Sequence, residues 1–282
     1  MNEVTSDAAE VAAAVDGTSG SALRQRSRTD TGTLGKAISV LEIVASADRP
    51  LRFTDILDQC DQPRGTLHRQ LSNLLEEGLL TLNRDHSYSL GLRLLQFAAK
   101  SWAGSQFRAI AEPHLKTLHE KTGETVHLGV LRGVEVIYLD KVESLQAVRM
   151  YSQIGNASPA FCTGVGKAAM SAMTDAALDK ILGDLTFRRF TEHTIVTPQD
   201  LKAELQNIRR TGNSYDREEH EIGIRCVAAP VYSHDRNFVA GISVTGPAYR
   251  VSMQSLQSWA GIVSEAAHAI MDEMAPRLGP RN

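Results

Sequence analysis

The sequence predicts an α+β protein in which a winged helix-turn-helix domain and a larger mixed helix and sheet domain are joined by a linker helix. Three observations carry this prediction. Residues 51–90 have the pattern of a short helix, a turn, a longer helix and a β-hairpin, in that order. The apolar period changes from helical to two at about residue 124. Strand patterns then stand at both ends of the C-terminal part, with helical patterns between them.

The two helical patterns in residues 51–90 are separated by a polar turn, Cys60-Asp61-Gln62-Pro63. Pro63 suits the first turn of a helix, so we expect the second helix to begin there. Apolar residues recur at helical spacing on both sides of the turn, which predicts that one face of each helix belongs to a core. These residues are Ile56, Leu57, Leu67, Leu71, Leu74 and Leu75.

The opposite face of the second helix carries polar and basic side chains that can reach phosphates and base edges in a DNA major groove. The candidate DNA-binding residues are Arg64, Gly65, Thr66, His68, Arg69 and Asn73. Strand patterns at 79–82 and 87–90 flank a polar turn, which predicts a wing with Arg84 at its tip. The alternative is a small helical bundle with a basic surface. The ordered arrival of all the elements favours the winged helix.

Length and composition are typical of a globular protein with two domains, since 42% of the 282 residues are hydrophobic and 22% are charged. Positive charge gathers near the predicted DNA-binding part: residues 21–108 contain 12 Lys and Arg against 9 Asp and Glu, although the net charge of the chain is −3. Arg24, Arg26 and Arg28 either follow DNA phosphates or belong to a solvated tail. We expect a disordered arm at 1–30, the winged helix at 31–90, the linker helix at 91–106 and the second domain at 107–282.

Cysteine usage and hydropathy indicate a cytoplasmic protein with no membrane partner. Cys60, Cys162 and Cys226 form no CxxC pair and leave an odd thiol, which is typical of a reducing compartment. No apolar run approaches the roughly 20 residues that span a bilayer. The N-terminus also lacks the basic and then apolar order of a secretory signal.

The second half of the chain begins with a helical pattern that continues to about residue 121 and has a break at Gly104. We expect Leu94, Leu95 and Phe97 of the linker helix to contribute to a dimer contact. The alternation after residue 124 predicts a hairpin. Helices are then expected near 165–183 and 198–212, strands near 225–233 and 238–246, and a final helix at about 252–274.

Four separated blocks of this sequence resemble the IclR family of bacterial transcriptional regulators, between about Gly35 and Ala275. They are TLHRQLSNLLEEGLL, GETVHLGVLRGVEVIYLDKVES, TGVGKAAMSAM and EEHEIGIRCVAAPVYSHDRNFVAGISVTGPAYRVS. The resemblance implies that the second domain is a GAF-like α/β effector-binding domain. It also implies assembly into homodimers or tetramers and a small organic acid or related metabolite as the effector. A dimer would match a palindromic operator in double-stranded DNA.

A glycine-containing loop, Gly164-Val165-Gly166-Lys167, directly precedes a helical pattern. Backbone N–H groups at a helix N-terminus can receive a carboxylate, helped by the helix dipole. The resemblance implies that Gly164 and Val165 are such donors to the effector. The alternative is that the glycines only allow a tight turn.

Ser243 and Thr245 occupy alternate positions of a strand pattern, so their hydroxyls point to one side, and Ile242 and Val244 point to the other. Threonine stands where several relatives have a second serine, and its methyl group narrows the pocket. The resemblance implies that the two hydroxyls share the effector site with Asp216, Ile224, Cys226, Met150 and Phe161. The loop at 153–159 aligns poorly with the family.

These side chains also have plainer interpretations. Cys226 fits a small buried hydrophobe, Asp216 precedes a turn that it can brace, and His127 fits a hydrogen-bonded core histidine. The cluster at 216–221 contains four acids and His220, but adjacent carboxylates without a second set of His or Cys residues are typical of a solvated loop. We therefore expect no metal and no cofactor.

Two classes of function follow from these patterns. The first is a sequence-specific transcriptional regulator, not an enzyme, in which a small organic acid or semialdehyde controls operator binding; family frequency favours a repressor of a catabolic operon. The second is an enzyme that acts on a small carboxylate through Cys226 or Cys162, but no nucleophile motif supports it and the winged helix would have no role. A constitutive architectural DNA binder would leave the second domain without a role.

Overall fold

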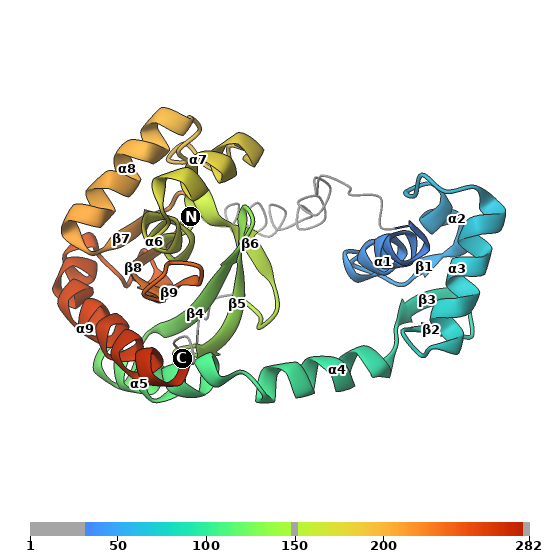
Figure 1. Cartoon of the computed structure of the whole chain (residues 1–282), viewed down its shortest axis with the longest axis horizontal. Coiled ribbons are helices and arrows are strands. Elements are labelled where there is room, and N and C mark those ends of the chain that lie inside the picture. The colour runs from blue at the N-terminus through green and yellow to red at the C-terminus, as the bar shows by residue number, and fades with distance from the viewer. Residues whose placement is uncertain (1–31, 148–151, 279–282) are drawn as a thin grey trace, which may run out of the picture. The chain divides into compact units, whose positions relative to one another are not determined.

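The computed structural model describes residues 32–147 and 152–278 (Figure 1). The chain divides into two compact units, residues 1–103 and 104–282. Each unit has a hydrophobic core of its own. The predicted fold class is confirmed, because a winged helix-turn-helix precedes a domain in which helices cover a six-stranded sheet. The arginines predicted in the N-terminal arm lie outside the described residues.

The N-terminal unit is a three-helix core with a small antiparallel sheet of strand order β1-β3-β2. The predicted apolar faces of α2 and α3 pack against α1, through Val40, Leu41 and Val44. Strand β1 was not expected, because two residues are too few to show a period of two. The elements are α1 (Gly32–Ala45), β1 (Leu51–Arg52), α2 (Phe53–Leu57), α3 (Arg64–Glu76), β2 (Leu80–Leu82), β3 (Ser87–Leu90) and α4 (Leu92–Ala103).

Two buried glutamines connect the helix-turn-helix to α1. Gln62 donates to the carbonyl oxygen of Lys36 at 3.0 Å, and Gln70 donates to that of Thr33 at 3.4 Å. Pro63 is the N-cap of α3 rather than a residue of its first turn, since its backbone is extended and its carbonyl oxygen accepts the first bonds of the helix. These contacts fix α3 against α1 and leave its other face exposed.

The C-terminal unit is built on one antiparallel sheet of strand order β6-β5-β4-β9-β8-β7. Its strands are β4 (Thr125–Arg132), β5 (Glu135–Val142), β6 (Ala157–Pro159), β7 (Ser214–Arg217), β8 (Ile224–Tyr232) and β9 (Val239–Pro247). Its helices are α5 (Gln106–Thr122), the 3-10 helix η1 (Ala160–Cys162), α6 (Gly164–Ser171), α7 (Asp175–Asp184), α8 (Pro198–Thr211) and α9 (Met253–Leu278).

Helices cover both faces of this sheet (Figure 1). Helices α5 and α9 pack on one face against a core that contains Val126, Val227, Ile242 and Val244. The short helix α6 lies on the other face, against β4, β8 and β9. Because side chains alternate along a strand, the residues between those core residues point toward α6. This alternation positions the polar residues described below.

Several expected boundaries differ from the structure. The helical pattern near 165–183 is two helices, α6 and α7, interrupted between Ser171 and Asp175. Strands β6 and β7 were not expected, because each has at most four residues and little apolar alternation. Asp216 precedes the turn at 218–223, as expected, and its Oδ1 accepts the N–H of Glu219 there; it also lies in β7 and pairs with Cys226 of β8. Among the described residues, no helix is both long enough and apolar enough to cross a membrane.

Candidate functional site

The exposed face of α3 carries the predicted DNA-binding residues. Leu67, Leu71 and Leu74 are buried on the opposite face, as the helical period predicts. Gly65 is exposed and Thr66 is half-buried, while the remaining side chains are exposed: Arg64, His68, Arg69 and Asn73. The structure therefore brings all six residues to one exposed or half-buried surface of α3.

Phe53, the first residue of α2, belongs to this surface and was missed by the sequence analysis. The Arg64 guanidinium lies 5.0 Å from the centroid of the Phe53 ring, in a cation–π arrangement, and the His68 ring lies 6.3 Å away. Together with Gly65, these residues line a hollow of about 350 Å³. A helical pattern marks Phe53 only as an apolar residue, whereas its position beside α3 depends on the packing of two helices.

The wing is a tight turn held by local hydrogen bonds. Asp85 Oδ1 accepts from the Ser87 hydroxyl at 2.6 Å and from the Ser87 N–H at 3.2 Å, and these bonds lower the pKa of Asp85. The Asn83 N–H donates to the Ser87 carbonyl oxygen at 2.8 Å. Arg84 is exposed between these residues. The turn thus presents a cation at the tip of a strand pair.

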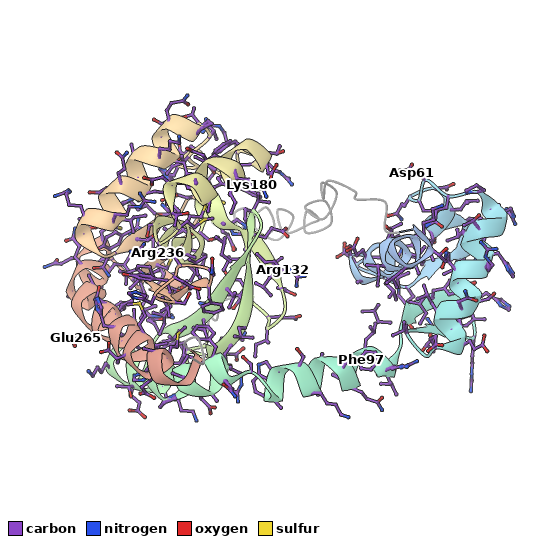
Figure 2. All side chains as sticks on the ribbon, in the orientation of Figure 1. Asp61, Phe97, Arg132, Lys180, Arg236 and Glu265 are labelled. Carbon is purple, nitrogen blue, oxygen red and sulfur yellow. The ribbon has the colours of Figure 1, made fainter. Side chains whose placement is uncertain are left out.

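Helix α4 has apolar side chains that its own unit does not bury. Leu92, Leu95 and Phe97 are exposed, and Figure 2 shows Phe97 on this helix. Leu94 differs, since it packs partly against the N-terminal core. The Arg93 guanidinium pairs with Glu77 and lies 5.3 Å from the centroid of the Phe97 ring.

A second candidate site lies on the sheet face that α6 covers. Ser243 and Thr245 of β9, Cys226 of β8 and Asp216 of β7 are all buried. The strand register places Asp216 opposite Cys226, and Cys226 opposite Thr245. The three side chains therefore form a polar row across three adjacent strands, with Ser243 beside it. Ser243 Oγ and Thr245 Oγ1 are 3.3 Å apart.

The N-terminus of α6 contacts this polar row. A Cβ atom on Gly164 would overlap the Cys226 sulfur, which the N–H groups of Gly164 and Asp216 also face. A Cβ atom on Gly166 would overlap the backbone of Ala160. Both glycines therefore permit close packing, and this packing places a helix N-terminus beside a carboxyl, a thiol and two hydroxyls. Val165, in contrast, directs its side chain into a small apolar cluster.

Burial raises the pKa values of the carboxyl and thiol groups in and near the polar row. Burial, and then the charge of Glu219, raises the pKa of Asp216 to about 7, against the stabilising 2.8 Å bond that its Oδ1 accepts from the Glu219 N–H. Burial raises the pKa of the Cys226 thiol to about 12 and that of Cys162 still further. Both thiols are therefore protonated at neutral pH, which is unfavourable for a nucleophile.

The acidic cluster at 216–221 is partly buried, which corrects the expectation of a solvated loop. The Lys167 ammonium group is fully buried and binds both carboxylate oxygens of Glu219, at 2.5 and 2.6 Å. Glu204 lies 3.4 Å from the same nitrogen. The hydroxyls of Thr191 and Thr194 donate to backbone carbonyl oxygens of this segment. Within the described residues, no three His, Cys, Asp or Glu side chains are placed to hold a metal ion.

His127 of β4 borders the polar row, directly opposite Ser243 in the register. Its Nδ1 lies 3.3 Å from Thr245 Oγ1 and its Nε2 lies 2.7 Å from Ser152 Oγ. Burial, and then the charge of Lys141, lowers the pKa of His127 to about 4, so the imidazole is neutral. The sequence analysis placed His127 in a core, and the structure adds that its partners are hydroxyls.

The remaining predicted residues are less closely joined to the row. Ile224 is half-buried at the start of β8 and shares the strand face of Cys226. The Phe161 ring packs against Phe187, at 5.2 Å between centroids, in the hydrophobic core that includes α8. Met150 lies outside the described residues.

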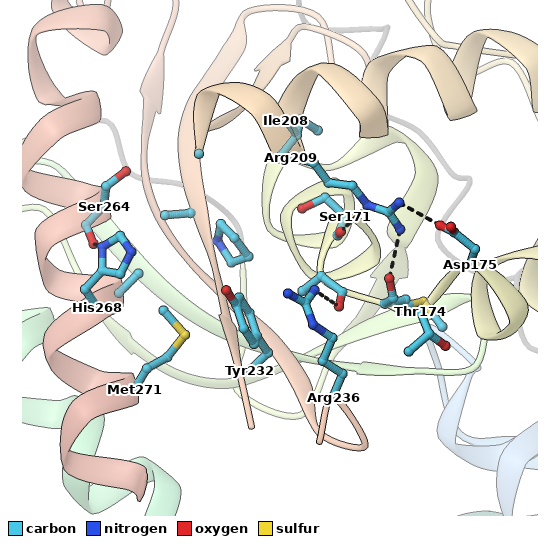
Figure 3. A pocket seen from close by; sticks show the side chains of 16 residues that line it. Ser171, Thr174, Asp175, Ile208, Arg209, Tyr232, Arg236, Ser264, His268 and Met271 are labelled. Carbon is cyan, nitrogen blue, oxygen red and sulfur yellow. Dashed lines mark hydrogen bonds and ion pairs between the residues drawn. The ribbon is translucent and has the colours of Figure 1, made fainter. Parts of the chain in front are cut away.

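A separate hollow of about 530 Å³ lies between α8, α9 and the end of β8 (Figure 3). Arg209 donates to the carbonyl oxygens of Ser171 and Met173, each at 2.8 Å, and Arg236 donates to that of Ala172 at 2.6 Å. These two guanidinium groups therefore satisfy the carbonyl end of α6. Of the predicted effector residues that the structure describes, none lines this hollow.

Two family models match the chain. One is described as the IclR helix-turn-helix domain and matches residues 33–84. The other is described as bacterial transcriptional regulator IclR C-terminal and matches residues 100–272, more than half of the chain. The chain belongs to the IclR family. As a member, it is a DNA-binding transcriptional regulator, and the interpretation as a cysteine-dependent enzyme is wrong, because the relatives are regulators.

Individual IclR relatives cover most of the chain. The HTH-type transcriptional regulator BhcR of Paracoccus denitrificans is 32% identical over 86% of this chain and 88% of its own length. The transcriptional repressor IclR of Escherichia coli is 29% identical over 84% and 88%. The crystal structure of Thermotoga maritima IclR is 30% identical, with a TM-score of 0.66 over 88% of this chain and 99% of that chain.

Proposed function

We propose that this IclR-family regulator binds a palindromic DNA operator as a homodimer or tetramer, and that a small organic acid or semialdehyde bound at the polar row controls that binding. The observation that carries the proposal is the juxtaposition of Asp216, Cys226, Ser243 and Thr245 with the N-terminus of α6. Hydroxyl and carboxyl groups have more lone pairs than their partners within the protein use, so this cluster suits a polar ligand.

The polar row suits a carboxylate or carbonyl group in particular. Ser243 and Thr245 supply hydroxyls, and the α6 N-terminus favours negative charge. Asp216, with a pKa of about 7, is partly protonated at neutral pH and can then donate to an anionic oxygen. The methyl group of Thr245 restricts the space beside it. These features support an oxygen-rich, small effector.

The effector proposal is tested by removing both hydroxyls. In the double variant Ser243→Ala/Thr245→Val we expect the free energy of effector binding to weaken by about 1–3 kcal/mol per lost buried hydrogen bond. Operator binding in the absence of effector should be unchanged. Calorimetry and a DNA mobility-shift assay measure the two effects together. Ser258→Ala, which changes an exposed hydroxyl on α9, is the matched control. Unchanged metabolite affinity in the double variant would place the effector elsewhere.

The ligand itself is to be found by a thermal stability screen with glyoxylate, pyruvate, keto-sugar acids, aromatic acids and semialdehydes. A ligand at 100 times its dissociation constant adds about 2.7 kcal/mol to the free energy of unfolding of the state that binds it. Repression of a catabolic operon is the proposed outcome, supported by relatives named as repressors in Escherichia coli and Salmonella typhimurium. A reporter gene fused to the promoter of the target operon tests repression: its expression should rise when the gene for this regulator is deleted.

DNA binding is assigned to the exposed face of α3 and to the wing. If Arg69 contacts a base edge, Arg69→Ala costs about 1–3 kcal/mol and relaxes specificity at one operator position. Arg84→Ala weakens binding to all sequences alike, because a wing contact to the backbone carries no sequence information. Arg132→Ala, at an exposed arginine of the β4–β5 turn, is the control. Wild-type affinity and salt dependence in both variants would contradict the assignment.

A further inference from the structure

The smaller hollow of the N-terminal unit lies beside the first turns of α3. Phe53 of α2 borders it together with Arg64, Gly65 and His68 of α3. The N-terminal residues of a recognition helix are those that contact base edges in the major groove. None of the four lining residues carries a carboxylate or a hydroxyl, and the Phe53 ring is only half-buried. The hollow therefore presents aromatic carbon at the place of the proposed base contacts.

The Arg64 guanidinium is held at this hollow without the use of its N–H groups. It lies 5.0 Å from the centroid of the Phe53 ring, and among the described residues it forms no hydrogen bond or ion pair. A cation–π contact acts through the charge and leaves the donors of a guanidinium free. A side chain that is already held in place also loses less freedom when it binds a partner. Arg64 is thus ready to donate to DNA while it remains on the ring.

Gly65 leaves this hollow open. A Cβ atom at Gly65 would meet no protein atom within 4 Å, and the residue is exposed. Its backbone is that of a right-handed α-helix, so the fold itself does not require glycine at this position. The absent side chain gives a partner access to the Phe53 ring beside the backbone of α3.

The groups that base pairs expose in the major groove decide what suits this ring. All four base pairs present hydrogen-bond donors or acceptors there, and the one apolar group is the 5-methyl group of thymine. The Phe53 ring offers no hydrogen bond to replace the water that a donor or acceptor loses. A methyl group loses no hydrogen bond on the same surface and gains from leaving water.

We propose that Phe53 is a specificity-determining residue, which receives the 5-methyl group of an operator thymine in this hollow while the N–H groups of Arg64 contact an adjacent base. The inference rests on the proposed assignment of DNA binding to the exposed face of α3. It extends sequence recognition to a residue of α2, outside the recognition helix. The thymine is read through its methyl group, so a base with the same hydrogen-bonding edge and no methyl group is bound more weakly.

Replacement of thymine by uracil removes this methyl group and leaves the hydrogen-bonding edge unchanged. An operator is first selected from random-sequence DNA with the full chain, and each of its thymines is then replaced in turn by deoxyuridine. We expect one position in each half-site at which the replacement weakens binding about fourfold, the effect of one buried methyl group. The inference is overturned if no thymine of the operator shows this effect in a mobility-shift titration.

The variant Phe53→Ala assigns the effect to the ring. At the sensitive position, we expect this variant to bind the thymine and uracil operators equally, because the surface that the methyl group contacts is gone. Tyr249→Ala, at an exposed aromatic residue of the C-terminal unit, is the control and retains the fourfold difference. The same fourfold difference in Phe53→Ala would show that another residue contacts the methyl group, and would overturn the inference.

A cross-link to the wild-type protein gives the same assignment if Phe53→Ala does not fold. In 5-iodouracil, iodine takes the place of the methyl group, and ultraviolet light couples this base to an aromatic side chain that it contacts. Trypsin separates Phe53 from His68, in the peptides FTDILDQCDQPR and GTLHR. We expect the cross-link at the sensitive position to be in the first peptide, at Phe53. A cross-link in any other peptide contradicts the inference.

The variant Gly65→Ala tests whether a base enters beside the helix backbone. Its Cβ atom has free space in the protein, so we expect an unfolding midpoint that is no lower than that of the wild type. The same atom crowds an incoming base, and operator affinity should fall about tenfold. Gly261→Ala, at an exposed glycine of α9 with the same free space, is the matched control. Unchanged operator affinity in Gly65→Ala would contradict entry of a base at this hollow.

Failure of this inference is distinguishable from failure of the proposed DNA-binding face. If Arg69→Ala and Arg84→Ala both bind the selected operator as the wild type does, the face itself is wrongly assigned. If those variants bind more weakly while no thymine is sensitive to uracil, the face stands and the role of Phe53 is limited to packing against α3.

Discussion

Asp216 places a buried carboxyl group in the core of the C-terminal unit, and its substitution by asparagine tests the electrostatics of the polar row. The pKa of Asp216 rises from 3.8 to about 7 in the folded protein, through burial first and the charge of Glu219 second. A raised pKa means that the folded state favours the protonated carboxyl. Its contribution to stability is therefore complete below about pH 3.8 and is lost as the pH rises through about 7.

The magnitude follows from the size of the shift. A displacement of about three pKa units, at about 1.4 kcal/mol per unit, corresponds to roughly 4 kcal/mol by which ionisation of Asp216 destabilises the folded state above pH 8. In Asp216→Asn the side chain stays neutral, and its amide oxygen can still accept the N–H of Glu219. We therefore expect the variant to be more stable than the wild type at pH 8.5, by up to about 4 kcal/mol, with no such electrostatic advantage at pH 4.

Urea unfolding at a series of pH values from 4 to 9 measures this difference, with the tryptophan fluorescence of the C-terminal unit as the signal. Trp259 of α9 packs against the core of that unit. Asp235→Asn is the control, because the Ser233 hydroxyl lowers the pKa of this exposed carboxyl and the pH dependence has the opposite sign. A stability difference between Asp216→Asn and the wild type that is the same at pH 4 and pH 8.5 would refute the reasoning.

Three further predictions concern stability and assembly. Lys167→Met removes the buried cation from the Glu219 carboxylate and leaves only the exposed Arg217, at 4.0 Å, so we expect a loss of about 3–5 kcal/mol in urea unfolding and partial recovery on adding Glu219→Gln; a loss below 1 kcal/mol would contradict it. Arg209→Ala removes hydrogen bonds to the end of α6, at about 0.5–1.5 kcal/mol each, and should lower the unfolding midpoint, while Arg210→Ala, on the same helix, should not. Leu95→Glu introduces charge among the exposed apolar side chains of α4 and should reduce the oligomer to monomer in light scattering; a wild-type monomer, with and without DNA, would overturn the proposed assembly.

The sequence alone determined the features that depend on neighbouring residues. The helical spacing of Leu67, Leu71 and Leu74 predicts which face of α3 is buried, and hence which face is exposed. Alternation along β9 predicts in the same way that Ser243 and Thr245 point to one side while Val244 points to the other. These predictions hold because the periodicity of a helix or strand is set by the local backbone.

Tertiary structure decided which of these faces meet. The imidazole of His127 reaches Thr245 across 118 positions of sequence, and the ammonium group of Lys167 reaches Glu219 across 52. Strand β7 became visible only through its pairing with β8, which places Asp216, before the turn that it braces, opposite Cys226. Pairing of this kind depends on strand register and on the packing of α6 against the sheet, and neither leaves a local pattern in the chain.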